Sequence, residues 1–371
     1  MTTNRLTGLN MFIRNNRLVS VLGWVCIVVL FFAVNNLIAQ RQSANSSVDY
    51  AEGIVIACGL NVILAVALNL VNGFTGQFSL GHIGFYAIGA YCAAAISTYG
   101  HARFLHALPF EHTGSAVPLA AAAVPVLCIC TVSGLAAAFV GFLVGMPSLR
   151  LRGDYLAIIT LGFAQIIQVV IRNIKAVDGA TSFNGITAHD ENGATIIIGT
   201  PHLTSFFWVY LTACVVICVS IRIRHSVHGL AFMAVRDDEI AAEAMGINTT
   251  KYKVTAFVIS AFFTGVAGAL FALYQPSLSN DQFNFMRSID IVVMVVLGGL
   301  GSVSGVAIAA VFLTVLPEAL RPIAQYRLVV YPLLLILLML TRPQGIFGRD
   351  EISFRSMQEW MRVKQRALRR S

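Results

Sequence analysis

Two stretches of this sequence carry polar side chains whose types and spacing could support a chemical role. The first, residues 69–91, interrupts apolar sequence with glycine, amide and hydroxyl side chains. Such a mixture destabilises a straight lipid-facing helix but suits a kinked segment whose backbone lines a cavity. The alternative is that the glycines only let neighbouring helices approach closely. The candidate cavity-lining residues, two of them from a second glycine-rich stretch, are Gly76, Gln77, Ser79, Gly81, His82, Gly84, Gly299 and Gly301.

The second stretch, residues 228–248, is rich in acidic residues and alanine and lies between apolar runs. Asp237 is expected to cap a short helix over residues 238–245, with acidic side chains at its positive end. Gly246 is expected to end that helix in a left-handed conformation. The helix would have about 9 residues and a length of ~13 Å. An ordinary solvated loop helix is the alternative, but the apolar side chains beside it require a cover.

The elements that hold these stretches are membrane spans. Of the 371 residues, 57% are hydrophobic and 11% are charged, whereas roughly 25% are charged in soluble proteins. The mean hydropathy is +0.78, and so few charges could not cover two or three soluble domains. The composition therefore indicates an integral membrane protein with several spans. It excludes a secreted enzyme, a nucleic-acid binder and a disordered chain.

The apolar runs of the chain predict the number of helices and their direction. The runs are residues 18–39, 53–71, 80–98, 117–144, 155–171, 203–221, 252–274, 289–316 and 328–341. Both ends of the chain are basic, which places them in the cytoplasm, whereas nine simple spans would put them on opposite sides. The run 289–316 is therefore expected to break at its glycine-rich segment 298–302. The prediction is an all-α polytopic transmembrane helix bundle with about 9–10 spanning or half-spanning helices and both termini cytoplasmic.

This topology divides the chain into a membrane domain with two flanking segments. In order, they are a cytoplasmic N-terminal segment (1–17), a transmembrane domain (18–341) with a cytosolic loop (222–251), and a basic cytoplasmic tail (342–371). The loops expected to face outward are residues 99–116, 173–202 and 275–288. The net charge of +8 fits this arrangement, because Lys and Arg collect in cytoplasmic loops.

Several kinds of functional group are missing from the predicted spans. No acidic or basic residue is expected deep in a span, since Asp154, Asp290 and Glu318 fall at span ends. His82 alone is expected to be a buried, hydrogen-bonded histidine and not a proton carrier. No glycine precedes a lysine, so a nucleotide phosphate loop is absent, and no nucleophile triad or zinc motif is present. The sequence thus indicates no catalytic, cofactor-binding or metal-binding site.

Five motifs and a short tail occur together in the chain. They are GFTGQFSLGHIGF (73–85), IGAY (88–91), LRLRGDYLAIITLGF (149–163), VRDDEIAAEAMGI (235–247), VLGGLGS (296–302) and RPQGIF (342–347). In this combination the chain resembles the permease subunit of bacterial ATP-binding-cassette importers for branched-chain amino acids. The resemblance covers about residues 50–348. Importers of urea and short-chain amides share much of the same pattern.

The resemblance implies where the chain meets its partners. The cytosolic loop would contain the helix that docks on the ATPase, although the glutamate that usually precedes the two alanines is Ile240 here. The implied partners are a second permease subunit, two cytosolic ATPase subunits that bind ATP and Mg, and a periplasmic substrate-binding protein. No cofactor is expected in this chain. The implied coupling residues are Arg236, Asp237, Asp238, Glu239, Ala241, Ala242, Glu243 and Gly246.

The expected function is therefore transport and not catalysis. The chain would form the path for leucine, isoleucine and valine across the bacterial inner membrane. One alternative is an importer of the same class that carries urea or short amides. Another is a urea- or glycerol-type channel without ATP coupling, which would not need the helix in residues 228–251. A membrane enzyme or receptor is disfavoured because the sequence lacks a catalytic constellation.

Overall fold

The computed structural model describes the central part of the expected bundle. The described residues are 46–101, 119–148, 154–174, 205–275 and 277–321, the segments 182–183, 186–189 and 195–198, and residues 333, 336, 340 and 345. The predicted first span, the N-terminal segment, nearly all of the last apolar run and all of the tail except residue 345 lie outside them. The location of the two termini therefore stays a prediction.

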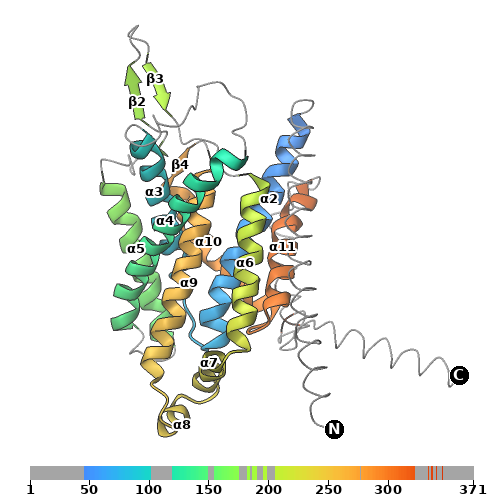
Figure 1. Ribbon diagram of the computed structural model, residues 1–371. Coiled ribbons are helices and arrows are strands. Elements are labelled where there is room, and N and C mark those ends of the chain that lie inside the picture. The colour runs from blue at the N-terminus through green and yellow to red at the C-terminus, as the bar shows by residue number, and fades with distance from the viewer. Residues whose placement is uncertain are drawn as a thin grey trace, which may run out of the picture.

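Long helices form the bundle, and they follow the predicted apolar runs (Figure 1). Five segments are long and apolar enough to cross a membrane: Tyr50–Phe74, Ala123–Ser148, Tyr155–Asn173, Phe206–Arg224 and Thr249–Ala272. The helices are α2 (Ser46–Asn69), η1 (Leu70–Phe74), α3 (His82–His101), α4 (Leu119–Ser148), α5 (Asp154–Asn173), α6 (Phe206–Arg224), α9 (Thr249–Ala272), α10 (Phe285–Gly298) and α11 (Val303–Ala319). The helical membrane bundle predicted from the sequence is confirmed for these residues.

Two helices of the bundle are interrupted by glycine-rich segments. After α2, the chain forms the short π-helix η1 and then an extended segment up to α3, and we call residues 70–81 the first break. The predicted interruption of the run 289–316 is confirmed, because α10 ends at Gly298 and α11 begins at Val303. We call residues 299–302 the second break.

The two ends of the bundle carry different elements (Figure 1). At one end lie the short helices α7 (Val227–Asp237) and α8 (Glu239–Ala244), which we call the α7–α8 hairpin. At the other end, β2 (Ile186–His189) pairs antiparallel with β3 (Thr195–Ile198). The same end holds β1 (Ser182–Phe183), which pairs antiparallel with β4 (Leu278–Ser279), and the 3₁₀ helix η4 (Asn280–Phe283). The sequence analysis did not predict these strands.

Glycine residues allow α3, α4 and α9 to approach within backbone contact. A Cβ atom added to Gly89 of α3 would lie 2.1 Å from the carbonyl oxygen of Gly265 on α9. One added to Gly268 would lie 2.2 Å from the carbonyl oxygen of Tyr86, and one added to Gly265 would lie 2.4 Å from the Cβ of Ala137 on α4. The spacing of these three helices therefore depends on residues without a side chain.

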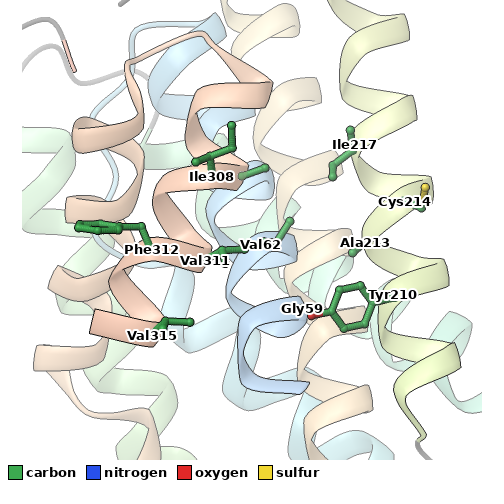
Figure 2. A pocket seen from close by; sticks show the side chains of 11 residues that line it. Gly59, Val62, Tyr210, Ala213, Cys214, Ile217, Ile308, Val311, Phe312 and Val315 are labelled. Atoms are coloured by element: carbon green, nitrogen blue, oxygen red, sulfur yellow. The ribbon is translucent and has the colours of Figure 1, made fainter. Parts of the chain in front are cut away.

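An apolar cavity of about 600 Å³ lies between α2, α6 and α11. Figure 2 shows Val62 of α2, Ile217 of α6 and Val311 of α11 among the side chains that line it. The Tyr210 hydroxyl at its rim donates a hydrogen bond to the carbonyl oxygen of Val55. Among the described residues, no acidic, basic or amide side chain lines this cavity, so this part of the chain offers no partner there for a charged substrate.

The two ends of the bundle can be assigned to the two sides of the membrane by thiol labelling. Gln282 in η4 and Met245 after α8 are both exposed, at opposite ends of the bundle. In a background without the native cysteines, we expect Gln282→Cys to react with an impermeant thiol reagent in intact cells. Met245→Cys should react only after lysis, because the positive-inside rule places the α7–α8 hairpin in the cytoplasm. Labelling of Met245→Cys in intact cells would overturn this orientation.

Candidate coupling and transport site

The two breaks meet in space, although more than 200 residues separate them in the chain. The side chain of Asn69, at the end of α2, is buried with 1% of its surface exposed. Its Oδ1 accepts a hydrogen bond from the backbone N–H of Gly301 at 2.9 Å, and its Nδ2 donates to the carbonyl oxygen of Ser302 at 3.3 Å. One amide side chain therefore accepts from the N–H of Gly301 and adds a second donor to the carbonyl of Ser302, which also accepts from the backbone N–H of Val306 in the first turn of α11.

Glycine is required where the breaks touch. A Cβ atom added to Gly73 would lie 2.5 Å from the backbone nitrogen of Gly301. In the second break, Gly299 and Gly301 have φ of 100° and 91°, a conformation that residues with a Cβ rarely adopt. Close contact and left-handed backbone thus explain three glycines of the predicted motifs.

Two arginines from the α7–α8 end donate further hydrogen bonds to the breaks. Nη1 of Arg236 on α7 donates to the carbonyl oxygen of Gly73 at 3.1 Å, and the same nitrogen lies beside Gly301. Nη1 of Arg224, at the end of α6, donates to the carbonyl oxygen of Gly301 at 3.0 Å. Arg236 also pairs with Asp237 at 3.1 Å. The α7–α8 hairpin is therefore bonded directly to the first break and packs against the second.

The predicted short helix is present but differs in its start and length. Asp238, and not Asp237, caps α8, because its Oδ1 accepts from the backbone N–H groups of Ile240 and Ala241. The helix has 6 residues instead of about 9, since Asp237 belongs to the preceding helix α7. The predicted left-handed end is confirmed, with φ of 83° at Gly246.

Several implied coupling residues contact the rest of the protein. Ala242 is buried with 4% of its surface exposed. Glu239 forms a 2.5 Å ion pair with Lys253 on α9, and Glu243 accepts a 2.7 Å hydrogen bond from Thr249. These contacts hold the α7–α8 hairpin rigidly on the first turns of α9.

Part of the outer surface at α8 is apolar. The exposed large hydrophobic side chains there are Ile240, at 68%, and Met245, directly after α8, at 83%. Ala241, which belongs to the implied coupling set, lies beside them and is also exposed. The set of coupling residues implied by the sequence did not include Ile240 or Met245, although the apolar side chains beside the acidic run were expected to need a cover.

The residues proposed to line a path are mostly packed against neighbouring helices. A Cβ atom on Gly81 would lie 2.6 Å from the carbonyl oxygen of Thr160 on α5, and one on Gly84 would lie 3.1 Å from the Cα of Ala164. These contacts favour the packing alternative for both glycines. In the first break, Gly76 is exposed with φ of 68°, whereas Gln77 is buried.

His82 anchors three helices through hydroxyl groups. Its Nε2 lies 2.7 Å from Oγ of Ser260 on α9, and Oγ of Ser260 donates to the carbonyl oxygen of Ala67 on α2 at 2.5 Å. The other ring nitrogen, Nδ1, lies 3.3 Å from Oγ of Ser79. His82 is 2% exposed, so the expectation of a buried, hydrogen-bonded histidine is confirmed.

The expectation that no charged residue lies deep in a span is wrong. Nη2 of Arg287 on α10 donates to Oδ1 of Asn61 at 2.8 Å. Asn61 stands at the middle of the segment Tyr50–Phe74, which is long enough to cross a membrane. Asp290 follows on the next turn of α10 and does not fall at a span end. The error arose because the apolar run began at residue 289 and Arg287 was assigned to an outer loop. The polar Asn61 inside an apolar run was the missed signal.

The contact between the breaks predicts a loss of stability when Asn69 is replaced. Asn69→Leu removes both hydrogen bonds and leaves the N–H of Gly301 buried without its acceptor, at about 1–3 kcal/mol. We expect the detergent-purified protein to unfold at a clearly lower temperature than the parent. The matched control is Asn173→Leu, because Asn173 is exposed and bonds only within its own helix. Equal unfolding temperatures for both variants would show that the breaks do not depend on Asn69.

Comparison with known proteins gives a consistent result. The family model described as branched-chain amino acid transport system / permease component matches residues 50–341. The chain is 36% identical over 322 residues to the high-affinity branched-chain amino acid transport system permease protein LivM of Salmonella typhimurium, which covers 80% of this chain and 70% of that protein. It is 36% identical over 308 residues to LivM of Escherichia coli, with 77% and 67% covered.

A second type of permease is also similar. The permease protein LivH of Escherichia coli is 29% identical over 296 residues, which cover 78% of this chain and 92% of LivH. No solved structure matches the chain. The family match covers residues 50–341, and helices α3 to α11 and both glycine-rich breaks lie within that range. The chain therefore belongs to the family of branched-chain amino acid transport permeases.

Proposed function

We propose that this chain is a transmembrane permease subunit of an ATP-driven importer that moves branched-chain amino acids across the bacterial inner membrane. The observation that supports this most directly is the bond from Arg236 on the α7–α8 hairpin to Gly73 in the first break. A channel without ATP coupling needs no terminal element bonded to the interrupted helices. A partner that moves this hairpin, in contrast, moves the breaks with it.

The proposed assembly rests on the lack of a nucleotide phosphate loop in this sequence and on the relatives of the chain. LivM and LivH of Escherichia coli are both similar to this chain, which supports pairing with a second permease subunit. Two cytosolic ATPase subunits would bind ATP and Mg and supply the energy, and a periplasmic protein would deliver the substrate. This chain needs no cofactor of its own. Residues 18–341 would form its membrane domain, between the cytoplasmic segments 1–17 and 342–371.

The docking surface for the ATPase is the apolar outer face of α8. Ile240 and Met245 project into solvent, whereas the salt bridge from Lys253 to Glu239 holds the helix from behind. Exposed apolar side chains on a rigid base are suited to bind a groove in a partner, because little conformational entropy is lost on docking. The acidic residues Asp237 and Asp238 beside them would set the register of the contact.

Reconstitution tests the proposed function. The complete importer in proteoliposomes, with its binding protein outside, should accumulate leucine when ATP and Mg are present at the ATPase face. It should not accumulate leucine when ATP is replaced by a non-hydrolysable analogue. Accumulation of urea instead of leucine would establish the alternative substrate class. Equilibration of substrate without ATP would establish a channel.

The docking surface predicts the effect of a single charge. Met245→Arg should reduce the amount of ATPase that co-purifies with the permease by at least about tenfold, because a charge would be buried in an apolar contact. The variant should still insert, since Met245 is exposed and outside the bundle. Gln282→Arg is the matched control, because it adds the same charge to an exposed residue at the opposite end. Normal co-purification of Met245→Arg would remove α8 from the ATPase contact.

A further inference from the structure

Arg287 and Asp290 are the charged side chains of α10, and they lie inside the bundle. The Arg287 guanidinium reaches Asn61, in the middle of the segment Tyr50–Phe74. Asn61 is 2% exposed, and its Nδ2 donates to Oγ1 of Thr314 on α11 at 2.8 Å. A guanidinium at this depth is unfavourable unless it faces protein or a water-filled space, and such residues commonly mark substrate paths.

The charge of Arg287 has no anionic partner among the described residues. Its side chain makes one hydrogen bond, to the neutral amide of Asn61, and no carboxylate lies within 4.0 Å of it in this part of the chain. A guanidinium has five N–H donors in a planar fork that matches a carboxylate. No described residue accepts a hydrogen bond from the other four donors, which remain to bind an anion.

The nearest charge along the helix has the opposite sign. Asp290 follows Arg287 by three residues, so their Cβ atoms are ~5–6 Å apart on one face of the helix, yet the two side chains form no ion pair. We propose that Arg287 and Asp290 bind the zwitterionic head group of an α-amino acid, with its carboxylate on Arg287 and its ammonium on Asp290. This inference rests on the proposed function, because it names the place where the transported substrate is held within the membrane.

The surroundings fit an aliphatic side chain on that amino acid. Met286, Ile289 and Val293 lie on the incompletely buried side of α10, beside the two charges. The apolar cavity of Figure 2 has no group for a charged head and is not an alternative place for it. A neutral substrate such as urea would need neither charge.

The site is also connected to the first break. Oγ of Ser288, between the two charged residues, donates to the carbonyl oxygen of Leu80 at the end of that break. The backbone N–H of Leu80 in turn donates to Oγ1 of Thr160 on α5 at 3.1 Å. Movement of the first break would therefore shift α10 and the two charges with it.

Uptake and hydrolysis measured together test this site. In the reconstituted importer, Asp290→Asn and Arg287→Gln should each reduce leucine uptake by at least about tenfold, the effect of losing one charged hydrogen bond. Binding-protein-stimulated ATP hydrolysis and the unfolding temperature should stay close to those of the parent. Asp290→Asn is nearly isosteric, so it tests charge without a change in packing. Arg172→Gln is the control, because it neutralises an exposed arginine paired with Asp281 at the outer surface.

Each outcome decides the proposal. Full leucine uptake in either variant would overturn it. A parallel fall of uptake, hydrolysis and unfolding temperature in both variants would assign the two residues to packing and would also overturn it. The proposed function itself is tested separately by the parent protein, which must accumulate leucine and not urea. If the parent and both variants carry leucine, the proposed function stands and the proposed site at Arg287 and Asp290 is rejected.

Discussion

Backbone groups that leave a helix inside a membrane must find partners within the protein, and this requirement organises the α7–α8 end of the bundle. The second break frees the N–H of Gly301 from helical bonding, and Asn69 on a distant helix accepts from it and also donates to the carbonyl of Ser302. Arg224 and Arg236 then satisfy carbonyl oxygens of the two breaks. Water could replace these donors in a soluble protein. In lipid their loss leaves buried polar groups unpaired.

The same requirement gives the protein a mechanical connection. The α7–α8 hairpin rests on α9 through the Lys253–Glu239 pair and reaches the first break through Arg236. The first break is bonded at its far end to Ser288 of α10. A displacement applied to α8 thus reaches α10 through bonded elements alone.

Much of the fold could be predicted from the sequence because apolar runs of sufficient length have few alternatives in a membrane. The interruption of residues 289–316 followed from chain parity and from the glycine-rich segment 298–302, whose three glycines in five residues are unsuited to one straight helix. The strands β2 and β3 were not predicted, because loop residues gave no alternating pattern long enough to indicate them.

The site was harder to predict than the fold. Which alanine of α8 faces outward depends on how the helix is rotated against α9, and Ala242 proved to be buried. The residue that caps α8 is Asp238 and not the predicted Asp237, because α7 continues through Asp237. Arg287 was assigned to an outer loop because α10 begins before its apolar run, and its contact with Asn61 joins residues 226 positions apart. No local sequence pattern contains such a contact.

The central claim is that Arg236 transmits movement of the α7–α8 hairpin to the breaks. The most direct measurement is the number of leucine molecules imported per ATP hydrolysed by the reconstituted importer carrying Arg236→Gln. Arg222→Gln serves as the reference, because Arg222 is an exposed arginine near the end of α6 that leads into α7. We predict that the importer carrying Arg236→Gln continues to hydrolyse ATP but imports far less leucine per ATP. The importer carrying Arg222→Gln should keep the parent's ratio of leucine imported to ATP hydrolysed. An unchanged ratio in Arg236→Gln would contradict it.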